Sequence, residues 1–177
     1  MKHVFVFDAD RCCACSACMI GCMDQNDIDS LAGDPCFRKT FNYEIDLTDG
    51  RTYCAYLSAA CMHCKDALCI AACPVGCIRK DSETGFTVYD NTNCIGCKSC
   101  AMACPFGAPR YRASDGKMVK CDGCNIRVKS GLKPACVRAC SFGALDCVPE
   151  EEYLAQSGSK ACGMLLEQMD LKRNIPY

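Results

Sequence analysis

Apolar residues occur along this chain in short runs that are separated by turn residues. Val4 to Phe7 is β-branched and aromatic, which is typical of a strand. Thr48-Asp49-Gly50 separates two longer runs, and such a turn between extended segments predicts a hairpin. The predicted hairpins pair Phe41–Leu47 with Arg51–Leu57 and Cys77–Lys80 with Phe86–Tyr89. The pattern predicts an α+β fold built from short elements.

Helical spacing is clear only in Lys160–Lys172, inside a C-terminal extension at 149–177. No window approaches about 18 consecutive apolar residues, so we expect no membrane span. The first 13 residues lack the apolar core of a secretory signal. We therefore expect a cytoplasmic protein, or one that is exported only together with a partner subunit.

Cysteine dominates the composition, with 22 of 177 residues, and leaves few apolar residues for an ordinary core. Metal centres or disulfides must then organise the fold. The formal net charge of −1 indicates neither a nucleic-acid-binding protein nor a membrane-surface protein.

Sixteen of the cysteines form four groups, each of which ends with the same x3 spacing. The groups are Cys12, Cys15, Cys18 and Cys22 (group one); Cys61, Cys64, Cys69 and Cys73 (group two); Cys94, Cys97, Cys100 and Cys104 (group three); and Cys121, Cys124, Cys136 and Cys140 (group four). We expect one or two helical turns after the last cysteine of each group. A turn at Ser114-Asp115-Gly116 should lead the chain through Lys117–Lys120 into group four.

Three cysteines at i, i+3 and i+6 let one tight loop bind three corners of a [4Fe-4S] cubane. The fourth cysteine then binds the other cluster of a two-cluster module. A disulfide scaffold would reproduce this nested spacing only by coincidence. Zinc would suit paired C-x2-C motifs, but the additional cysteines exceed one tetrahedral site. The spacing therefore favours four [4Fe-4S] clusters, which would add a charge of roughly −8.

Groups two and three, with Cys73-Pro74, Cys104-Pro105 and the hairpin between them, resemble a bacterial two-cluster ferredoxin. The resemblance implies two clusters here, one on Cys61, Cys64, Cys69 and Cys104 and one on Cys94, Cys97, Cys100 and Cys73. Groups one and four would form a second such pair around this insert, one on Cys12, Cys15, Cys18 and Cys140 and one on Cys121, Cys124, Cys136 and Cys22.

The order of the four groups and their differing gaps resemble the iron–sulfur electron-transfer subunits of the dimethyl sulfoxide reductase type over roughly residues 1–148. This family implies two ferredoxin-like modules, an outer one at 1–53 plus 113–148 and an inserted one at 54–112. It also implies a molybdopterin or tungstopterin catalytic subunit as partner and, often, a membrane anchor. Cys22 and Cys140 precede Met23 and Ser141 where the other two groups have proline, a departure that does not affect ligation.

Some residues near the groups allow two interpretations. Cys13, Cys36, Cys54, Cys77, Cys147 and Cys162 are expected to be mostly buried apolar residues, although Cys13 is an alternative ligand beside Cys12. His63 is expected to be a packed or solvent-facing loop residue; the alternative is that it donates to a cluster sulfide or shifts a cluster potential through its protonation. Eight basic residues between 110 and 138 either dock a partner or raise nearby cluster potentials, or they compensate cluster charge on a solvated surface: Arg110, Arg112, Lys117, Lys120, Arg127, Lys129, Lys133 and Arg138.

No nucleotide-binding fingerprint is present, and with only His3 and His63 available no Ser/His/Asp set can be formed. We therefore expect a non-catalytic electron-transfer subunit. The alternatives are a polyferredoxin-like subunit that links a hydrogenase to a formate dehydrogenase, and a redox-sensing iron–sulfur module.

Overall fold

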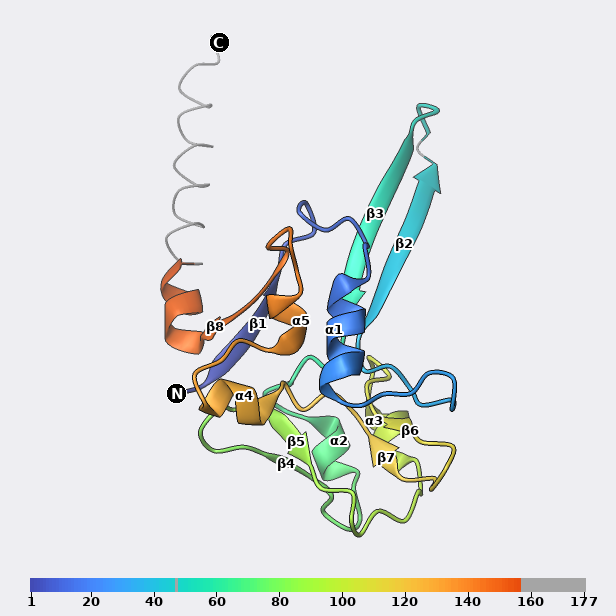
Figure 1. Ribbon diagram of the computed structural model, residues 1–177, viewed down its shortest axis with the longest axis vertical. Helices are drawn as coiled ribbons and strands as arrows, with labels where there is room; N and C mark the ends of the chain where they lie inside the picture. The colour runs from blue at the N-terminus through green and yellow to red at the C-terminus, as the bar shows by residue number, and fades with distance from the viewer. Residues whose placement is uncertain (47, 157–177) are drawn as a thin grey trace, which may run out of the picture.

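The computed structural model describes residues 1–46 and 48–156 of the chain (Figure 1). In chain order, the elements are β1 (His3–Phe7), α1 (Ala17–Gln25), β2 (Lys39–Asp46), β3 (Thr52–Ala59), α2 (Leu68–Ala71), β4 (Ile78–Lys80), β5 (Thr87–Tyr89), α3 (Ser99–Ala103), β6 (Arg110–Tyr111), β7 (Met118–Val119), α4 (Asn125–Lys129), α5 (Ala135–Arg138) and β8 (Leu145–Pro149). Residues 150–156 are also helical. The expected helix Lys160–Lys172 and Cys162 lie outside the described residues. The mixture of short helices and strands makes the fold α+β.

Both predicted hairpins are confirmed. β2 pairs with β3 from Lys39 opposite Ala59 to Asp46 opposite Thr52, and β4 pairs with β5. The turn at Ser114-Asp115-Gly116 is also confirmed, because it joins the short paired strands β6 and β7. Strand β6, the partner of β7, was not expected from the sequence, because two residues are too few to show an alternating pattern.

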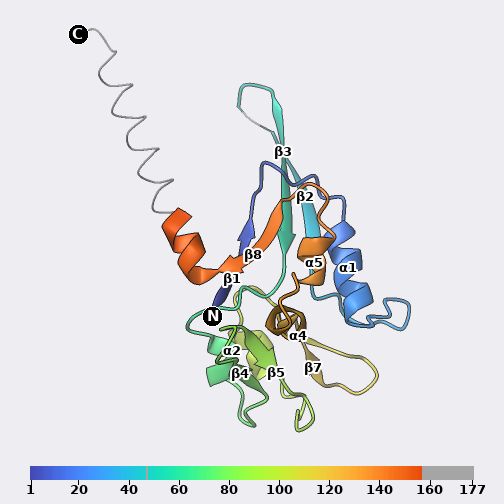
Figure 2. The same ribbon diagram turned by 60° about the vertical axis from the view of Figure 1, so that its left-hand side comes forward.

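The predicted N-terminal strand is confirmed as β1, which pairs antiparallel with β8 over five residues. Phe5 lies opposite Cys147, and Phe7 lies opposite Leu145. This pairing brings the chain before group one beside the chain after group four, two segments that are far apart in the sequence (Figure 2).

The expected position of the helical turns was wrong. In groups two, three and four the helix precedes the fourth cysteine: α3 ends directly before Cys104, and α2 and α5 end one residue short of Cys73 and Cys140. The x3 spacing between the third and fourth cysteines is one helical turn, so the helix spans that gap. Proline after Cys73 and Cys104 cannot continue a helix. Of these four helices, only α1 extends past the last cysteine of its group, from Cys22 to Gln25.

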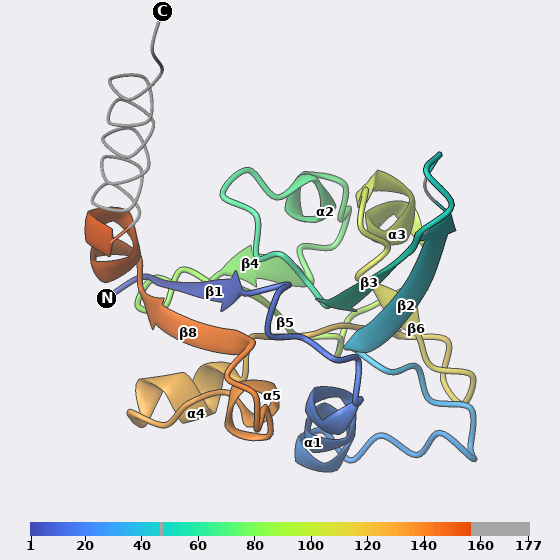
Figure 3. The same ribbon diagram turned by 90° about the horizontal axis from the view of Figure 1, so that it is seen from above.

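The helices pack in two pairs, α1 with α5 and α2 with α3. In Figure 3, α1, α4 and α5 lie on one side of the strands, and α2 and α3 lie on the other. A Cβ at Gly21 would lie 2.9 Å from the Cβ of Ala139, so glycine is required for the close approach of α1 to α5. These pairs join group one to group four and group two to group three.

Cysteine thiols form much of the core, which has two parts. One contains Cys18, Cys22, Cys136, Val137 and Leu145, and the other contains Cys69, Cys77, Ile78, Cys100 and Met118. This arrangement agrees with the scarcity of ordinary apolar residues in the sequence.

Asp81 ties the β4–β5 turn to α4. Its carboxylate accepts hydrogen bonds from the backbone N–H of Thr84 at 3.0 Å and from Asn125 Nδ2 at 3.1 Å, and it lies 2.7 Å from Lys129 Nζ. Burial acts to raise the pKa of Asp81, but the hydrogen bonds from Lys129 and its other donors lower the pKa well below its usual range overall. The charged form of Asp81 is therefore the one that stabilises this junction.

The β2–β3 hairpin projects from the rest of the described residues (Figures 1 and 2). Alternation places its apolar side chains on one face, where they stay largely exposed: Phe41, Tyr43, Ile45, Tyr53 and Leu57. Among the described residues, no helix has the length and apolar character needed to cross a membrane.

Candidate iron–sulfur sites

The four cysteine groups share one backbone feature. The residue directly before the second cysteine has a positive φ in every group: Ala14 (51°), His63 (47°), Gly96 (66°) and Gly123 (77°). This left-handed conformation costs a residue with a side chain roughly 1–2 kcal/mol. Its presence at an alanine and a histidine indicates that the fold imposes the same tight turn on each C-x2-C pair.

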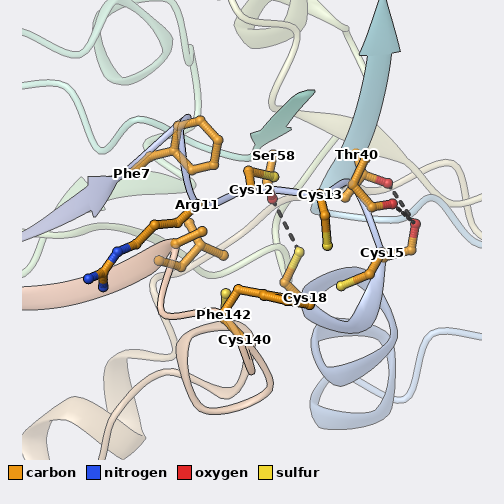
Figure 4. Close-up of a pocket in the computed structure, with 14 residues that line it drawn as sticks. Phe7, Arg11, Cys12, Cys13, Cys15, Cys18, Thr40, Ser58, Cys140 and Phe142 are labelled. Atoms are coloured by element: carbon orange, nitrogen blue, oxygen red, sulfur yellow. Dashed lines mark hydrogen bonds between the residues drawn. The ribbon is translucent and has the colours of Figure 1, made fainter. Parts of the chain in front are cut away.

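Group one and the last cysteine of group four line a single pocket (Figure 4). Cys12, Cys15, Cys18 and Cys140 all face it, together with Cys13. These are the four residues predicted to share a cluster, plus the alternative ligand.

The rest of group four lies beside Cys22 of group one. Burial and then the neighbouring Cys136 and Cys124 thiolates raise the pKa of Cys22 to about 12. Burial, Cys61 and Cys22 likewise raise the pKa of Cys121. Four sulfurs in proximity, each buried or partly buried, oppose ionisation unless a positive core compensates their charge, and an iron–sulfur core provides such charge.

Groups two and three exchange neighbours in the same way. Burial is the main cause that raises the pKa of Cys69, and Cys61 and Cys104 raise it further. Burial and then Cys73 raise the pKa of Cys100 despite the lowering effect of Tyr111. One lysine and one tyrosine interact electrostatically with the remaining members: the Lys80 charge acts on Cys64, Cys61 and Cys69, and Tyr111, which hydrogen-bonds Cys100, also acts on Cys94 and Cys97.

Backbone N–H groups donate to several of these sulfurs. The donors are Cys77 N to Cys73 Sγ (3.2 Å), Ala108 N to Cys104 Sγ (3.4 Å), Met118 N to Cys94 Sγ (3.4 Å) and Gly123 N to Cys121 Sγ (3.4 Å). In the first two, the donor follows its cysteine by four residues, across the turn that the proline begins. Such hydrogen bonds favour the thiolate, the form that binds metal.

Side chains supply further hydrogen bonds to sulfur. Arg38 donates to Ser58 Oγ at 3.0 Å, which leaves the Ser58 hydroxyl to donate to Cys18 Sγ at 3.2 Å. Tyr111 OH lies 3.1 Å from Cys100 Sγ. Sequence reasoning missed Ser58, Arg38 and Tyr111, because each lies far from the motif it contacts.

Asn26 takes the place of a backbone donor in group one. Its Nδ2 lies 3.6 Å from Cys22 Sγ, and it also donates to the Cys22 carbonyl at 2.7 Å. α1 continues past Cys22 to Gln25. The residue four positions after Cys22, Asn26, therefore makes this contact through its side chain and not through its backbone N–H.

Within residues 1–46 and 48–156, no three His, Cys, Asp or Glu side chains lie close enough to hold one metal ion. A [4Fe-4S] cluster does not need that convergence, because its four cysteines bind four different irons. The cysteine sets, their hydrogen-bond donors and the repeated turns therefore fit the demands of such a cluster.

The cysteines outside the groups do not all behave as expected. Cys77 is buried as predicted, and burial followed by the Cys73 charge raises its pKa to about 11. Cys36 and Cys147 are partly buried. The expectation was wrong for Cys13 and Cys54, which are exposed, because Cys13 lies at the surface of its loop and Cys54 lies on the projecting hairpin.

His63 is packed rather than solvent-facing, and it also contacts a cysteine. Its ring lies 4.8 Å from that of Phe86, and its Nε2 lies 3.6 Å from Cys121 Sγ. Burial and then the Lys120 charge lower its pKa well below the usual range. The packed interpretation is confirmed, and the contact with the sulfur of Cys121 is an additional finding.

The basic residues between 110 and 138 do not form one exposed surface. Arg112, Lys129 and Lys133 form salt bridges with Asp115, Asp81 and Asp146, respectively. Lys120 instead is fully buried.

Comparisons with known proteins agree with this geometry. Residues 52–149 match the family model of the 4Fe-4S dicluster domain. The B subunit of the anaerobic dimethyl sulfoxide reductase of Haemophilus influenzae is 40% identical over 168 residues, which cover 90% of this chain and 80% of the relative. This chain belongs to that family of iron–sulfur electron-transfer subunits.

More distant relatives of this chain are named after other enzyme complexes. The hydrogenase-2 operon protein HybA of Escherichia coli O157:H7 is 32% identical, covering 86% of this chain and 53% of the relative. The iron–sulfur subunit of the nitrate-inducible formate dehydrogenase of Escherichia coli K12 is 31% identical, covering 84% and 55%. The prediction of family from the cysteine groups is confirmed.

Proposed function

We propose that this chain holds four [4Fe-4S] clusters and relays single electrons to or from a molybdopterin- or tungstopterin-containing catalytic subunit. The proposed ligand sets are Cys12, Cys15, Cys18 and Cys140 (the group-one cluster); Cys61, Cys64, Cys69 and Cys104 (the group-two cluster); Cys94, Cys97, Cys100 and Cys73 (the group-three cluster); and Cys121, Cys124, Cys136 and Cys22 (the group-four cluster).

The observation that carries this proposal is that the fourth cysteine of each group lies near cysteines of another group. Cys140 shares a pocket with group one, and Cys22 interacts with Cys124 and Cys136 of group four. Cys104 interacts with Cys69 in the same way, and Cys73 interacts with Cys100. This pattern is that of two-cluster ferredoxins, in which the fourth cysteine of one motif binds the other cluster.

We further propose that the chain comprises an outer module, 1–53 plus 113–148, and an inserted module, 54–112. The pairings of β1 with β8 and of α1 with α5 support the outer module, because each joins the two ends. The pairings of β4 with β5 and of α2 with α3 support the inserted one.

When bound, the clusters supply one-electron redox chemistry at potentials that the protein sets. The chain's own residues supply thiolates, N–H and O–H donors to those thiolates, and burial. Positive charge and hydrogen bonds toward the sulfurs stabilise the more negative, reduced form and so raise its potential. The substrate reaction then belongs to the partner, and this subunit is not itself catalytic.

The partner proposal rests on the relatives. The 40% identity to the B subunit of a dimethyl sulfoxide reductase favours a molybdopterin enzyme as the partner. A link between a hydrogenase and a formate dehydrogenase is the second candidate, favoured by the two more distant relatives.

Anaerobic purification of the tagged chain from its native host tests this proposal. We expect a catalytic subunit that contains pterin and molybdenum or tungsten to co-purify, and its reduction by a viologen dye to require this chain. A chain with Cys64→Ser, which replaces a single sulfur by oxygen, should co-purify but transfer electrons poorly. Co-purification of a hydrogenase subunit without a pterin protein would reject the first candidate in favour of the second.

A further inference from the structure

Lys120 is a fully buried lysine at the junction of groups two and four. It is 0% exposed, and its Nζ donates to the carbonyl of Thr87 and, at 2.7 Å, to that of Cys121. The same Nζ lies 3.9 Å from Cys61 Sγ. In the described part of the chain, Lys120 forms no salt bridge with a carboxylate, in contrast to Lys129 and Lys133.

A buried ammonium group is costly unless negative charge compensates it. Two carbonyls solvate Lys120 but carry no net charge. Lys120 Nζ lies near Cys61 Sγ, and its charge also acts on the thiol of the adjacent Cys121, which belongs to a different group. Lys120 therefore lies where one positive charge acts on two sets of thiolates.

His63 connects the same two groups. The backbone N–H of Thr87 donates to His63 Nδ1 at 3.1 Å, so the ring proton resides on Nε2. That Nε2 lies 3.6 Å from Cys121 Sγ, and it is the atom that donates there. His63 itself belongs to the loop between Cys61 and Cys64, so a side chain of the group-two loop hydrogen-bonds a group-four sulfur.

Lys80 and Phe86 hold His63 in this position. Lys80 Nζ donates to the His63 carbonyl at 2.9 Å, which fixes the strained backbone of the loop. Phe86, 0% exposed, packs against the imidazole ring. The His63 side chain is therefore oriented from both ends.

We propose that Lys120 and His63 form a link between the group-two and group-four clusters, in which Lys120 raises the reduction potentials of both clusters and His63 raises that of the group-four cluster. Both are positioning residues that act on thiolate ligands, and the inference rests on the proposed function. A positive charge or an N–H donor near a ligand sulfur stabilises the reduced cluster, which carries one more negative charge.

A potentiometric titration followed by electron paramagnetic resonance tests this link in the full chain. Cys64→Ser and Cys124→Ser first identify which reduction steps belong to the group-two and group-four clusters. Lys120→Met should then shift the reduction equilibria of those two steps at least tenfold toward the oxidised form, a change of about 59 mV for one electron. Lys120→Arg, which keeps the charge, should show only a small part of that shift.

Lys133→Met is the matched control, because Lys133 is exposed and pairs with Asp146. It should leave all four steps within threefold of their original equilibria. His63→Leu should lower the reduction potential of the group-four step and leave that of the group-two step unchanged. This variant also tests the link if Lys120→Met does not assemble its clusters.

The outcomes separate the link from the proposed function. An unaltered chain that binds no iron–sulfur clusters would reject the proposed function. If the clusters assemble normally and neither Lys120→Met nor His63→Leu changes any reduction potential, the link alone is overturned. An equal shift of all four steps in Lys120→Met would also overturn it, because the charge would then act without preference for groups two and four.

Discussion

Replacing Gly123 with alanine should weaken the contact between the group-four loop and the β4–β5 hairpin. A Cβ at this position would lie 2.5 Å from Cδ2 and 2.8 Å from Cε2 of Phe86. Phe86 is fully buried, so its ring cannot move out into solvent without losing that packing. Overpacking of this kind costs about 1–3 kcal/mol, and the left-handed φ of +77° adds about 1–2 kcal/mol.

Gly116→Ala is the matched control, because Gly116 has a φ of +67° but nothing within 4 Å of an added Cβ. It should show only the backbone cost. The difference between the two variants, about 1–3 kcal/mol, isolates the contact with Phe86. If that cost falls on the folded state, it accelerates unfolding by roughly 5-fold to 150-fold.

The measurement is the rate at which visible cluster absorbance bleaches at a fixed guanidinium concentration under anaerobic conditions. A rate is appropriate because cluster loss makes unfolding irreversible. Combining Gly123→Ala with Phe86→Leu should cost less than the sum of the single variants, since the smaller side chain relieves the clash. Equal bleaching rates for Gly123→Ala and Gly116→Ala would refute the reasoning.

Three further predictions follow from the contacts of the sites. Asp81→Asn should reduce stability by about 1–3 kcal/mol at pH 7; because the folded-state pKa is lowered, this loss should shrink as the pH falls below about 4, as thermal scans can measure. Tyr111→Phe should lower the potential of the group-three cluster by roughly 40 mV, the equivalent of one hydrogen bond, in a potentiometric titration. Cys104→Ser should alter the same paramagnetic signal as Cys61→Ser and leave the signal changed by Cys94→Ser intact.

Each of these predictions has a clear contrary result. A stability loss in Asp81→Asn that persists unchanged at low pH would mean that its charge is not what stabilises the junction. Unaltered potentials in the Tyr111→Phe protein would show that the Tyr111 hydroxyl does not affect the potential of the group-three cluster. A Cys104→Ser spectrum that matches Cys94→Ser would show that the fourth cysteines are not exchanged.

Much of the fold could be predicted because strands and turns here are local. Thr48-Asp49-Gly50 specifies a hairpin by its own turn chemistry, and the strands beside it alternate. The family was equally accessible, because cysteine spacing records the demands of the cofactor directly. The predicted position of the helices is wrong because the x3 spacing between the third and fourth cysteines is one helical turn and not the end of a loop.

The contacts that tune the sites could not be predicted, since they join distant segments. Ser58 reaches Cys18 from the β2–β3 hairpin, and Lys120 reaches Cys61 across 59 residues. Lys120 follows the pattern of a surface lysine in the sequence, and only the structure shows that it is buried. His63 was a candidate because it lies between two ligands, but its partner Cys121 belongs to another group.

The most direct test of the account is the iron and acid-labile sulfide content of the anaerobically purified chain. We predict about sixteen of each per polypeptide, held as four [4Fe-4S] clusters by the sixteen grouped cysteines. A colourless protein, or one with no more than about eight irons after full reconstitution, would contradict it.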